Sequence, residues 1–318
     1  MNKNIYILLV FLIVGFLYPL VLPGYLTVAI TVMIFAGWAS SWNILGGWAG
    51  QLSLGHASFV GLGAYFVAVG VNTFGLAPWW SIILAMLTAA FLAYLWGKMT
   101  FSLRGPYFSL STIAVAEILR LVAINEKWLT GGATGVFIET LPEPFGIDLF
   151  SKNSQYYLAF IYALITISVT IYISTKKFGY ELRAIREDED AAMAAGINPV
   201  SVKLRAFMLS AALTALGGGV YGVFLSFIEP HLIFNLLISV QIALTVIIGG
   251  RGTVWGPVVG SIVLVGVGEF FRTSFAQANM LVYGILILVV ILLMPRGIVG
   301  ELTYKFMRRK YANLTRSK

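Results

Sequence analysis

The amino-acid sequence predicts an all-α protein that crosses a membrane several times. Of its 318 residues, 59% are hydrophobic and only 11% are charged, whereas a soluble domain carries roughly 25% charged residues. The apolar residues form continuous runs and not the alternating pattern of a membrane β-barrel. These observations argue against a soluble enzyme, a nucleic-acid-binding domain and a disordered protein. The absence of cysteine excludes disulfides and thiolate metal sites.

Each membrane-spanning helix needs about 20 mostly apolar residues, and about ten segments meet or approach this length. The shorter segments are candidates for tilted, re-entrant or broken helices, so we expect between about eight and ten spanning helices. The first segment follows Lys3 and lacks the small-residue cleavage site of a signal peptide before Pro23, which favours a retained helix. The predicted segments are residues 5–22, 26–45, 57–72, 79–97, 106–123, 156–175, 206–228, 234–249, 254–271 and 279–294.

The distribution of lysine and arginine predicts the orientation. Cytoplasmic loops of membrane proteins carry an excess of these residues. With the N-terminus inside, the cytoplasmic stretches contain 17 of the 21, all except Arg120, Lys127, Lys152 and Arg272. Both termini are therefore predicted to be cytoplasmic. We expect one membrane domain over residues 1–318, with an outer loop at 124–155, a cytoplasmic loop at 176–205 and a basic tail at 295–318 that rests on anionic lipid.

The cytoplasmic loop contains a predicted short helix. The acidic run 187–190 precedes the segment AAMAA, and acidic groups stabilise a helix N-terminus. Gly196 and the pair Asn198-Pro199 end the helix, because glycine suits a C-terminal cap and proline cannot continue the hydrogen-bond ladder. Its spacing fits either a solvated loop helix or a docking site, since small side chains let another protein approach closely. The small residues are Ala191, Ala192 and Ala195.

A family resemblance favours docking. Residues 190–196 read D-A-A-x-x-x-G and resemble the E-A-A-x-x-x-G motif of ABC importer permeases, with Asp190 in place of glutamate, although the later I-x-L-P portion is absent because residues 206–209 read AFML. Five ordered blocks, at 46–65, 103–118, 130–136, 183–199 and 249–261, together resemble the LivM-type permeases of branched-chain amino-acid ABC importers. The resemblance implies that the loop helix docks on an ATPase subunit through Arg186, Asp190, Ala191, Ala192, Ala195 and Gly196.

The resemblance also implies partners and a location. The complete importer would contain a second, LivH-like permease, two ATP-binding cassette ATPase subunits and a periplasmic solute-binding protein, in the bacterial inner membrane. ATP and Mg would be used by the ATPase subunits, and this chain would hold no cofactor and no metal. The sequence agrees, because it contains no G-x-x-x-x-G-K-[ST] phosphate loop. Branched-chain amino acids are the expected solute, with urea, short amides and other amino acids as alternatives.

Polar residues within the apolar segments are candidates for the translocation path, because ionisable groups in a membrane are costly. Glu117 lies three residues before Arg120, so the two share a helix face and can pair. Gln51, His56 and Ser58 follow the glycine-rich stretch 46–55. The alternatives are an interfacial ion pair for Glu117 and a packed, satisfied side chain for His56. A self-sufficient secondary transporter, the second hypothesis, would use these two residues to bind a coupling ion. An intramembrane enzyme is disfavoured, because no nucleophile is paired with a base.

Glycine pairs four residues apart predict close helix packing. Gly218 and Gly222 form one G-x-x-x-G pair, and Gly256 and Gly260 form another. Residues 217–222 also fit the pattern G-x-G-x-x-G of dinucleotide-binding proteins. That motif needs a preceding strand and a soluble βαβ unit, whereas here an apolar helix surrounds it.

Overall fold

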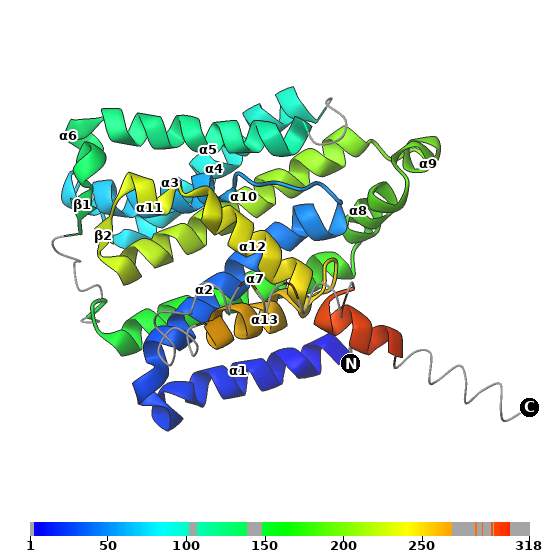
Figure 1. The fold of residues 1–318 in the computed structure, drawn as a ribbon, viewed down its shortest axis with the longest axis horizontal. Coiled ribbons are helices and arrows are strands. Elements are labelled where there is room, and N and C mark those ends of the chain that lie inside the picture. Colours follow the sequence, from blue (N-terminus) through cyan, green and yellow to red (C-terminus); the bar gives the residue numbers. More distant parts are fainter. Residues whose placement is uncertain are drawn as a thin grey trace, which may run out of the picture.

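The computed structural model describes residues 3–101, 107–138, 148–268 and 296–305, together with Gly284, Leu288 and Met294. Its long helices run side by side along the longest axis of the molecule (Figure 1). The elements are α1 (Lys3–Val21), η1 (Pro23–Tyr25), α2 (Leu26–Trp42), η2 (Asn43–Trp48), α3 (His56–Asn72), α4 (Pro78–Thr100), α5 (Tyr107–Asn125), α6 (Lys127–Thr130), η3 (Gly132–Thr134), β1 (Val136–Phe137), α7 (Lys152–Ser174), α8 (Lys177–Glu187), α9 (Glu189–Ala194), α10 (Pro199–Leu225), β2 (Phe227–Ile228), α11 (Pro230–Ile233), α12 (Leu236–Gly249), α13 (Gly256–Ser261) and η5 (Ile262–Val267).

Within the described ranges, seven helices are long and apolar enough to cross a membrane. The protein is therefore an all-α, multi-pass membrane protein, although the expectation of about ten spanning helices is not confirmed. Two predicted segments correspond to shorter apolar helices, His56–Asn72 and Gly256–Gly266. The tenth segment, 279–294, lies almost wholly outside the described residues, as do the end of the ninth and most of the basic tail.

Helix α10 forms the centre of the bundle, because it packs against α2, α3, α4 and α7. Glycine makes this packing close. A Cβ on Gly218 would lie less than 3.0 Å from the carbonyl oxygen of Val60 on α3, and one on Gly63 of α3 would lie equally close to Ala215 on α10. A Cβ on Gly222 would lie 3.1 Å from the Cα of Ala64. The backbones of α3 and α10 are therefore in direct contact.

The second glycine pair lies in α13, which packs against α12. A Cβ on Gly256 would approach the carbonyl oxygen of Gly250 to less than 3.0 Å, and one on Gly260 would do the same with Thr245. The turn between the two helices, residues 250–255, is thereby held close to the end of α12. Gly250 (φ +130°) and Gly252 (φ +76°) give this turn backbone angles that other residues rarely adopt.

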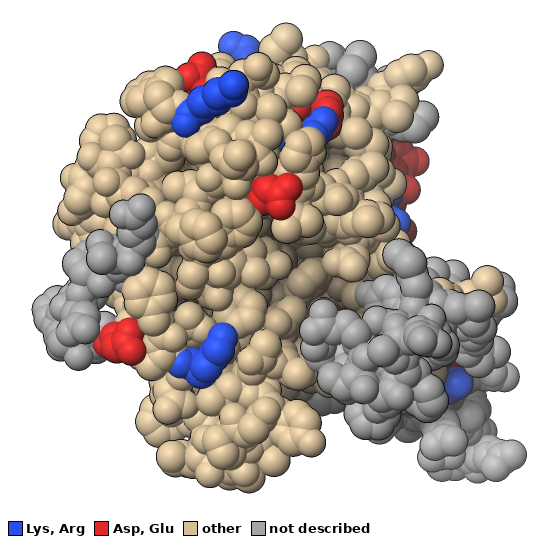
Figure 2. Space-filling model, turned by 60° about the vertical axis from the view of Figure 1, so that its left-hand side comes forward, with Lys and Arg blue, Asp and Glu red and all other residues tan. Residues whose placement is uncertain are grey.

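The two predicted loops lie at opposite ends of the bundle (Figure 1). Helices α8 and α9 lie at the end that also holds the N-terminus. The other end holds α6, α11 and the antiparallel pair β1–β2, in which Val136 is opposite Ile228. Figure 2, which turns this second end toward the viewer, shows a surface with few and scattered charged side chains.

Candidate functional site

In the loop between α7 and α10, hydrogen-bonded helix caps fix both ends of the short helix α9. Asp188 separates α8 from α9 with an extended backbone, and its carboxylate accepts hydrogen bonds from the amides of Asp190 (2.9 Å) and Ala191 (3.0 Å). At the other end Gly196 has a φ of +83°. Its amide donates to the Met193 carbonyl (2.9 Å), and the next amide donates to Ala192 (3.0 Å), which completes a Schellman motif. Helix α9 therefore has fixed limits despite its six residues.

The two faces of α9 differ. Ala192 is buried in the cluster that holds Ile185, Val202 and Ala206, so its side chain packs within this chain. A second attachment is the ion pair of Glu189 with the buried Lys203 of α10 (2.6 Å). The opposite face is exposed to solvent and carries one large apolar side chain, Met193, which is 46% exposed. The exposed residues of this face are Asp190, Ala191, Met193, Ala194, Ala195 and Gly196.

Arg186 connects α8 to the spanning helices. Its Nη1 donates to the carbonyl oxygen of Gly47 (3.1 Å), and its Nη2 pairs with Glu187 (2.6 Å). Gly47 belongs to η2, the π-helical turn that ends α2. The guanidinium also lies against Gly252, because a Cβ there would come within 2.5 Å of Nη1. Partial burial and the nearby Arg186 lower the pKa of Arg251 in the same turn. Positive charge is thus concentrated where α8 meets this turn.

Two further side chains complete this region, which we call the α8 junction (Asn43, Gly47, Trp48, Arg186 and Gly252). The buried amide of Asn43 donates to the Thr253 carbonyl (2.8 Å) and accepts from the Gly252 amide (2.9 Å). The indole of Trp48 donates to the Gly252 carbonyl (2.8 Å). Sequence analysis missed both residues. The available signal was an amide and an indole near the end of a long apolar run.

Replacing Asn43 with leucine is expected to destabilise the protein by about 2–4 kcal/mol, because the Gly252 amide and the Thr253 carbonyl would lose their buried partners. Thermal unfolding of the purified variant in detergent measures this. Ser40, one turn earlier, is the control: its hydroxyl is buried without a hydrogen-bond partner among the described residues. Ser40→Ala is therefore expected to leave the melting temperature unchanged or to raise it. Equal melting temperatures for the two variants would contradict the role given to Asn43.

His56 is buried in a hydrogen-bonded chain between three helices. Its Nε2 lies 2.8 Å from Ser210 Oγ on α10, and its Nδ1 lies 3.0 Å from Ser53 Oγ. Ser210 uses its only proton to donate to the Ser41 carbonyl of α2 (2.8 Å). Ser210 must therefore accept from Nε2, which assigns the Nε2–H tautomer of a neutral imidazole with both nitrogens bonded. This arrangement fits a packed, satisfied histidine.

The other path candidates are separated from His56. Ser58 is buried on α3 and donates to the Gly55 carbonyl, while Gln51 is partly exposed in the segment before α3. Glu117 lies on a face of α5 that is exposed in this chain, where both carboxylate oxygens accept from Arg120. Arg120 Nη1 also lies 2.9 Å from Nδ1 of His231 on α11. His56 and Ser58 are thus buried on α3, Gln51 is partly exposed before it, and Glu117 belongs to a charged group on α5 and α11.

Among the described residues, no group of three histidine or carboxylate side chains is placed to hold a metal ion. The described polar side chains of the site form hydrogen bonds and ion pairs, as Asn43, Arg186 and Lys203 do. The bundle of membrane-length apolar helices, with a structured loop helix at one end, defines a multi-pass membrane protein as the class of protein.

Comparison with known sequences places the chain in a family. Residues 24–292 match the family described as "Branched-chain amino acid transport system / permease component". The chain therefore belongs to this family of permease components.

Individual relatives agree. The chain is 27% identical to the high-affinity branched-chain amino acid transport system permease protein LivM of Salmonella typhimurium, over 92% of this chain and 74% of the relative. It is 28% identical to LivM of Escherichia coli, over 86% of this chain and 70% of the relative. The permease protein LivH of Salmonella typhimurium is 25% identical to it, over 83% of this chain and 90% of the relative. No solved structure matches the chain significantly.

Proposed function

We propose that this chain is one of two permeases of an ATP-driven importer for branched-chain amino acids in the bacterial inner membrane. The observation that supports this most strongly is the family match over residues 24–292. Both termini and α9 would lie in the cytoplasm, and β1 and β2 outside. A LivH-like permease would supply the other half of the path. Two ATPase subunits would bind and hydrolyse ATP with Mg, and a periplasmic protein would deliver the solute.

The exposed face of α9 would dock on an ATPase subunit. Asp190, Ala191, Ala195 and Gly196 lie on this face, and Met193 would add an apolar anchor that the sequence analysis did not include. Ala192 would act differently from the original expectation. Because its side chain is buried within the chain, it would hold α9 in place and make no contact with the partner.

Movement of the ATPase would reach the spanning helices through fixed contacts. The pair of Glu189 with Lys203 joins α9 to α10, and Arg186 joins α8 to the end of α2. A push on α9 would therefore move the cytoplasmic ends of both helices together. Interfaces and packed cores have discrete arrangements, so a small displacement can change the packing of a whole helix.

The group of Glu117, Arg120 and His231 would face the second permease and the path. Ionised side chains that face hydrocarbon cost about 2.5–3.5 kcal/mol each at the bilayer centre. The Glu117 side chain is 51% exposed in this chain, so a partner or water is expected to cover it. The His56 network would instead hold α2, α3 and α10 together.

Removing the charge of Glu117 is expected to reduce solute uptake roughly tenfold, which corresponds to about 1.4 kcal/mol, because Arg120 would lose its ion-pair partner. Uptake of labelled leucine by the complete importer measures this in Glu117→Gln. A charge-swapped variant, Glu117→Arg with Arg120→Glu, is the control and should recover part of the activity. Wild-type uptake in Glu117→Gln would contradict a position at the path.

Reconstitution tests the function as a whole. The complete importer in liposomes with internal ATP and Mg should accumulate leucine, isoleucine or valine in preference to urea and short amides. The chain alone should accumulate none of them. If the chain alone transported leucine in response to a proton or sodium gradient, the self-sufficient carrier would replace this proposal.

A further inference from the structure

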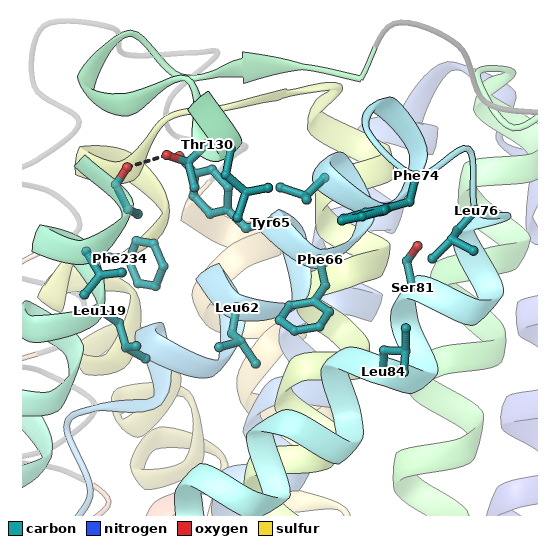
Figure 3. Close-up of a pocket in the computed structure, with 15 residues that line it drawn as sticks. Leu62, Tyr65, Phe66, Phe74, Leu76, Ser81, Leu84, Leu119, Thr130 and Phe234 are labelled. Atoms are coloured by element: carbon teal, nitrogen blue, oxygen red, sulfur yellow. Dashed lines mark hydrogen bonds between the residues drawn. The ribbon is translucent and has the colours of Figure 1, made fainter. Parts of the chain in front are cut away.

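A cavity of about 350 Å³ opens between α3, α4 and α5 near the end that holds α6 (Figure 3). Of its 15 lining residues, only Tyr65, Ser81 and Thr130 have a polar side-chain atom. The Thr130 hydroxyl already has partners within the chain: it lies within hydrogen-bond distance of the carbonyls of Ala123 and Glu126 and accepts from the Gly132 amide. The cavity is therefore an apolar space with two remaining hydroxyl groups.

Those two hydroxyl groups have no hydrogen-bond partner among the described residues. Both Ser81 Oγ and Tyr65 Oη are buried. Figure 3 shows the Ser81 hydroxyl beside Phe74 and Leu76, at one end of the cavity. Buried polar atoms in native proteins almost always have a partner. A bound molecule with at least one hydrogen-bonding group at this end would supply it.

The lower end of the cavity in Figure 3 is apolar. Leu62 and Phe66 of α3, Leu84 of α4 and Leu119 of α5 line it, below the Ser81 hydroxyl in that view. Cavities lined by apolar side chains stay dry, and they bind apolar molecules when these can enter. An empty space would also cost the lining atoms their dispersion contacts.

Aromatic residues mark the depth of the polar end. Tryptophan is enriched where a membrane meets water. Trp80, directly before Ser81, is 62% exposed, and Trp128 on α6 is 76% exposed. The Ser81 hydroxyl therefore lies near the membrane–water interface, and the apolar end of the cavity points into the hydrocarbon of the membrane. Lys127, on the same short helix as Trp128, adds a cation at the level of lipid headgroups.

The mouth of the cavity is also apolar. Three of its lining residues, Phe74, Leu84 and Val122, are 65%, 45% and 52% exposed. Leu84 and Val122 lie on helices that are long and apolar enough to cross the membrane. The opening is thus framed by side chains that suit a lipid-filled surrounding.

From this geometry we infer that the cavity binds one acyl chain of a membrane phospholipid, with the lipid ester group at Ser81 and its phosphate on the side of Lys127. The acyl chain fills the space among Leu62, Phe66 and Leu119. It so separates α4 from α5 at the cavity. The site lies apart from the α8 junction and from α9, so it does not depend on the proposed docking of an ATPase.

Photocrosslinking of a lipid tests the inference. The complete importer is placed in vesicles of phosphatidylethanolamine and phosphatidylglycerol that include a phosphatidylglycerol with a diazirine in its acyl chain. Labelled residues are then mapped by peptide mass spectrometry. We expect label on the partly buried Leu62, Phe66 and Leu119, in addition to Phe91, an exposed residue of α4 that does not line the cavity. Label confined to exposed positions would overturn the inference.

Matched tryptophan variants isolate the cavity. Leu84→Trp fills the mouth and should lower cavity labelling severalfold relative to labelling at Phe91. Leu87→Trp, on the same helix, is the control, because Leu87 is 64% exposed and does not line the cavity. Val122→Trp fills the mouth from α5 and replaces Leu84→Trp if that variant does not fold. Equal cavity labelling in the mouth-filling and control variants would overturn the inference.

Two further conditions, added leucine and the absence of the other subunits, distinguish a lipid from other occupants of the cavity. Displacement of the label by saturating leucine would assign the cavity to the solute path. Labelling of the isolated chain that disappears in the complete importer would assign it to the second permease. Either result would overturn the lipid assignment, whereas unchanged labelling under both conditions supports it.

Discussion

Replacing Gly218 with alanine is expected to destabilise the protein by about 3 kcal/mol or more, since overpacking a core costs typically 1–3 kcal/mol and occasionally more. The added Cβ would lie less than 3.0 Å from three backbone atoms of Val60. A flexible side chain could move aside, but backbone atoms can yield only if α3 and α10 separate. Because α10 also packs against α2, α4 and α7, the separation would disturb most of the bundle.

Two alanine variants serve as controls for Gly218→Ala. Gly222→Ala, on the same helix, should cost less, because its nearest neighbour would lie 3.1 Å away and the alanine gains about 1 kcal/mol of helix propensity. Gly24→Ala should be neutral, because no atom lies within 4 Å of its added Cβ. Thermal unfolding in detergent ranks the three. A Gly218→Ala protein as stable as Gly24→Ala would contradict the direct backbone contact.

Met193→Asp is expected to lower ATP-driven uptake by about 100-fold, corresponding to about 2.7 kcal/mol of docking free energy. Met193 is the large apolar side chain on the exposed face of α9, and a charge there would need desolvation in any protein interface. The stability of the permease itself should not change, because the side chain packs outside the core clusters. Uptake of labelled leucine and ATPase binding are measured together.

Val200→Asp is the matched control for Met193→Asp. Val200 lies in the first turn of α10 and is 43% exposed, close to the 46% of Met193. It is not part of α9, and aspartate near a helix N-terminus is tolerated. Uptake should therefore remain near that of the wild type. An equal loss in both variants would contradict a docking face confined to α9.

Much of the fold could be predicted because apolar run length depends on local sequence alone. The predicted segment 79–97 corresponds to α4 (Pro78–Thr100), and 156–175 to α7 (Lys152–Ser174). The start of α10 was predicted seven residues too late, at 206. The Asn198 cap and Pro199 begin this helix before its apolar run, so hydropathy alone misses its first two turns. The segment between α7 and α10 accordingly ends at residue 198.

The candidate site was less predictable, because its contacts join distant parts of the chain. Capping of α9 by Asp188 and Gly196 depends on neighbouring residues and could be anticipated from them. The bond from Asn43 to Thr253 spans 210 positions, and no local pattern indicates it. Burial of Ala192 depends on Val202 and Ala206 across the loop, so the sequence could not separate it from its exposed neighbours.

Co-purification tests the central claim, that α9 couples this permease to ATPase subunits, most directly. The tagged chain is expressed with the genes that adjoin its own and purified in mild detergent. Wild type and Val200→Asp should each recover a second permease and two ATPase subunits. Met193→Asp should retain the second permease and lose the ATPases. A wild-type chain that purifies alone as a stable species, or a Met193→Asp chain that retains the ATPases in full, would contradict the claim.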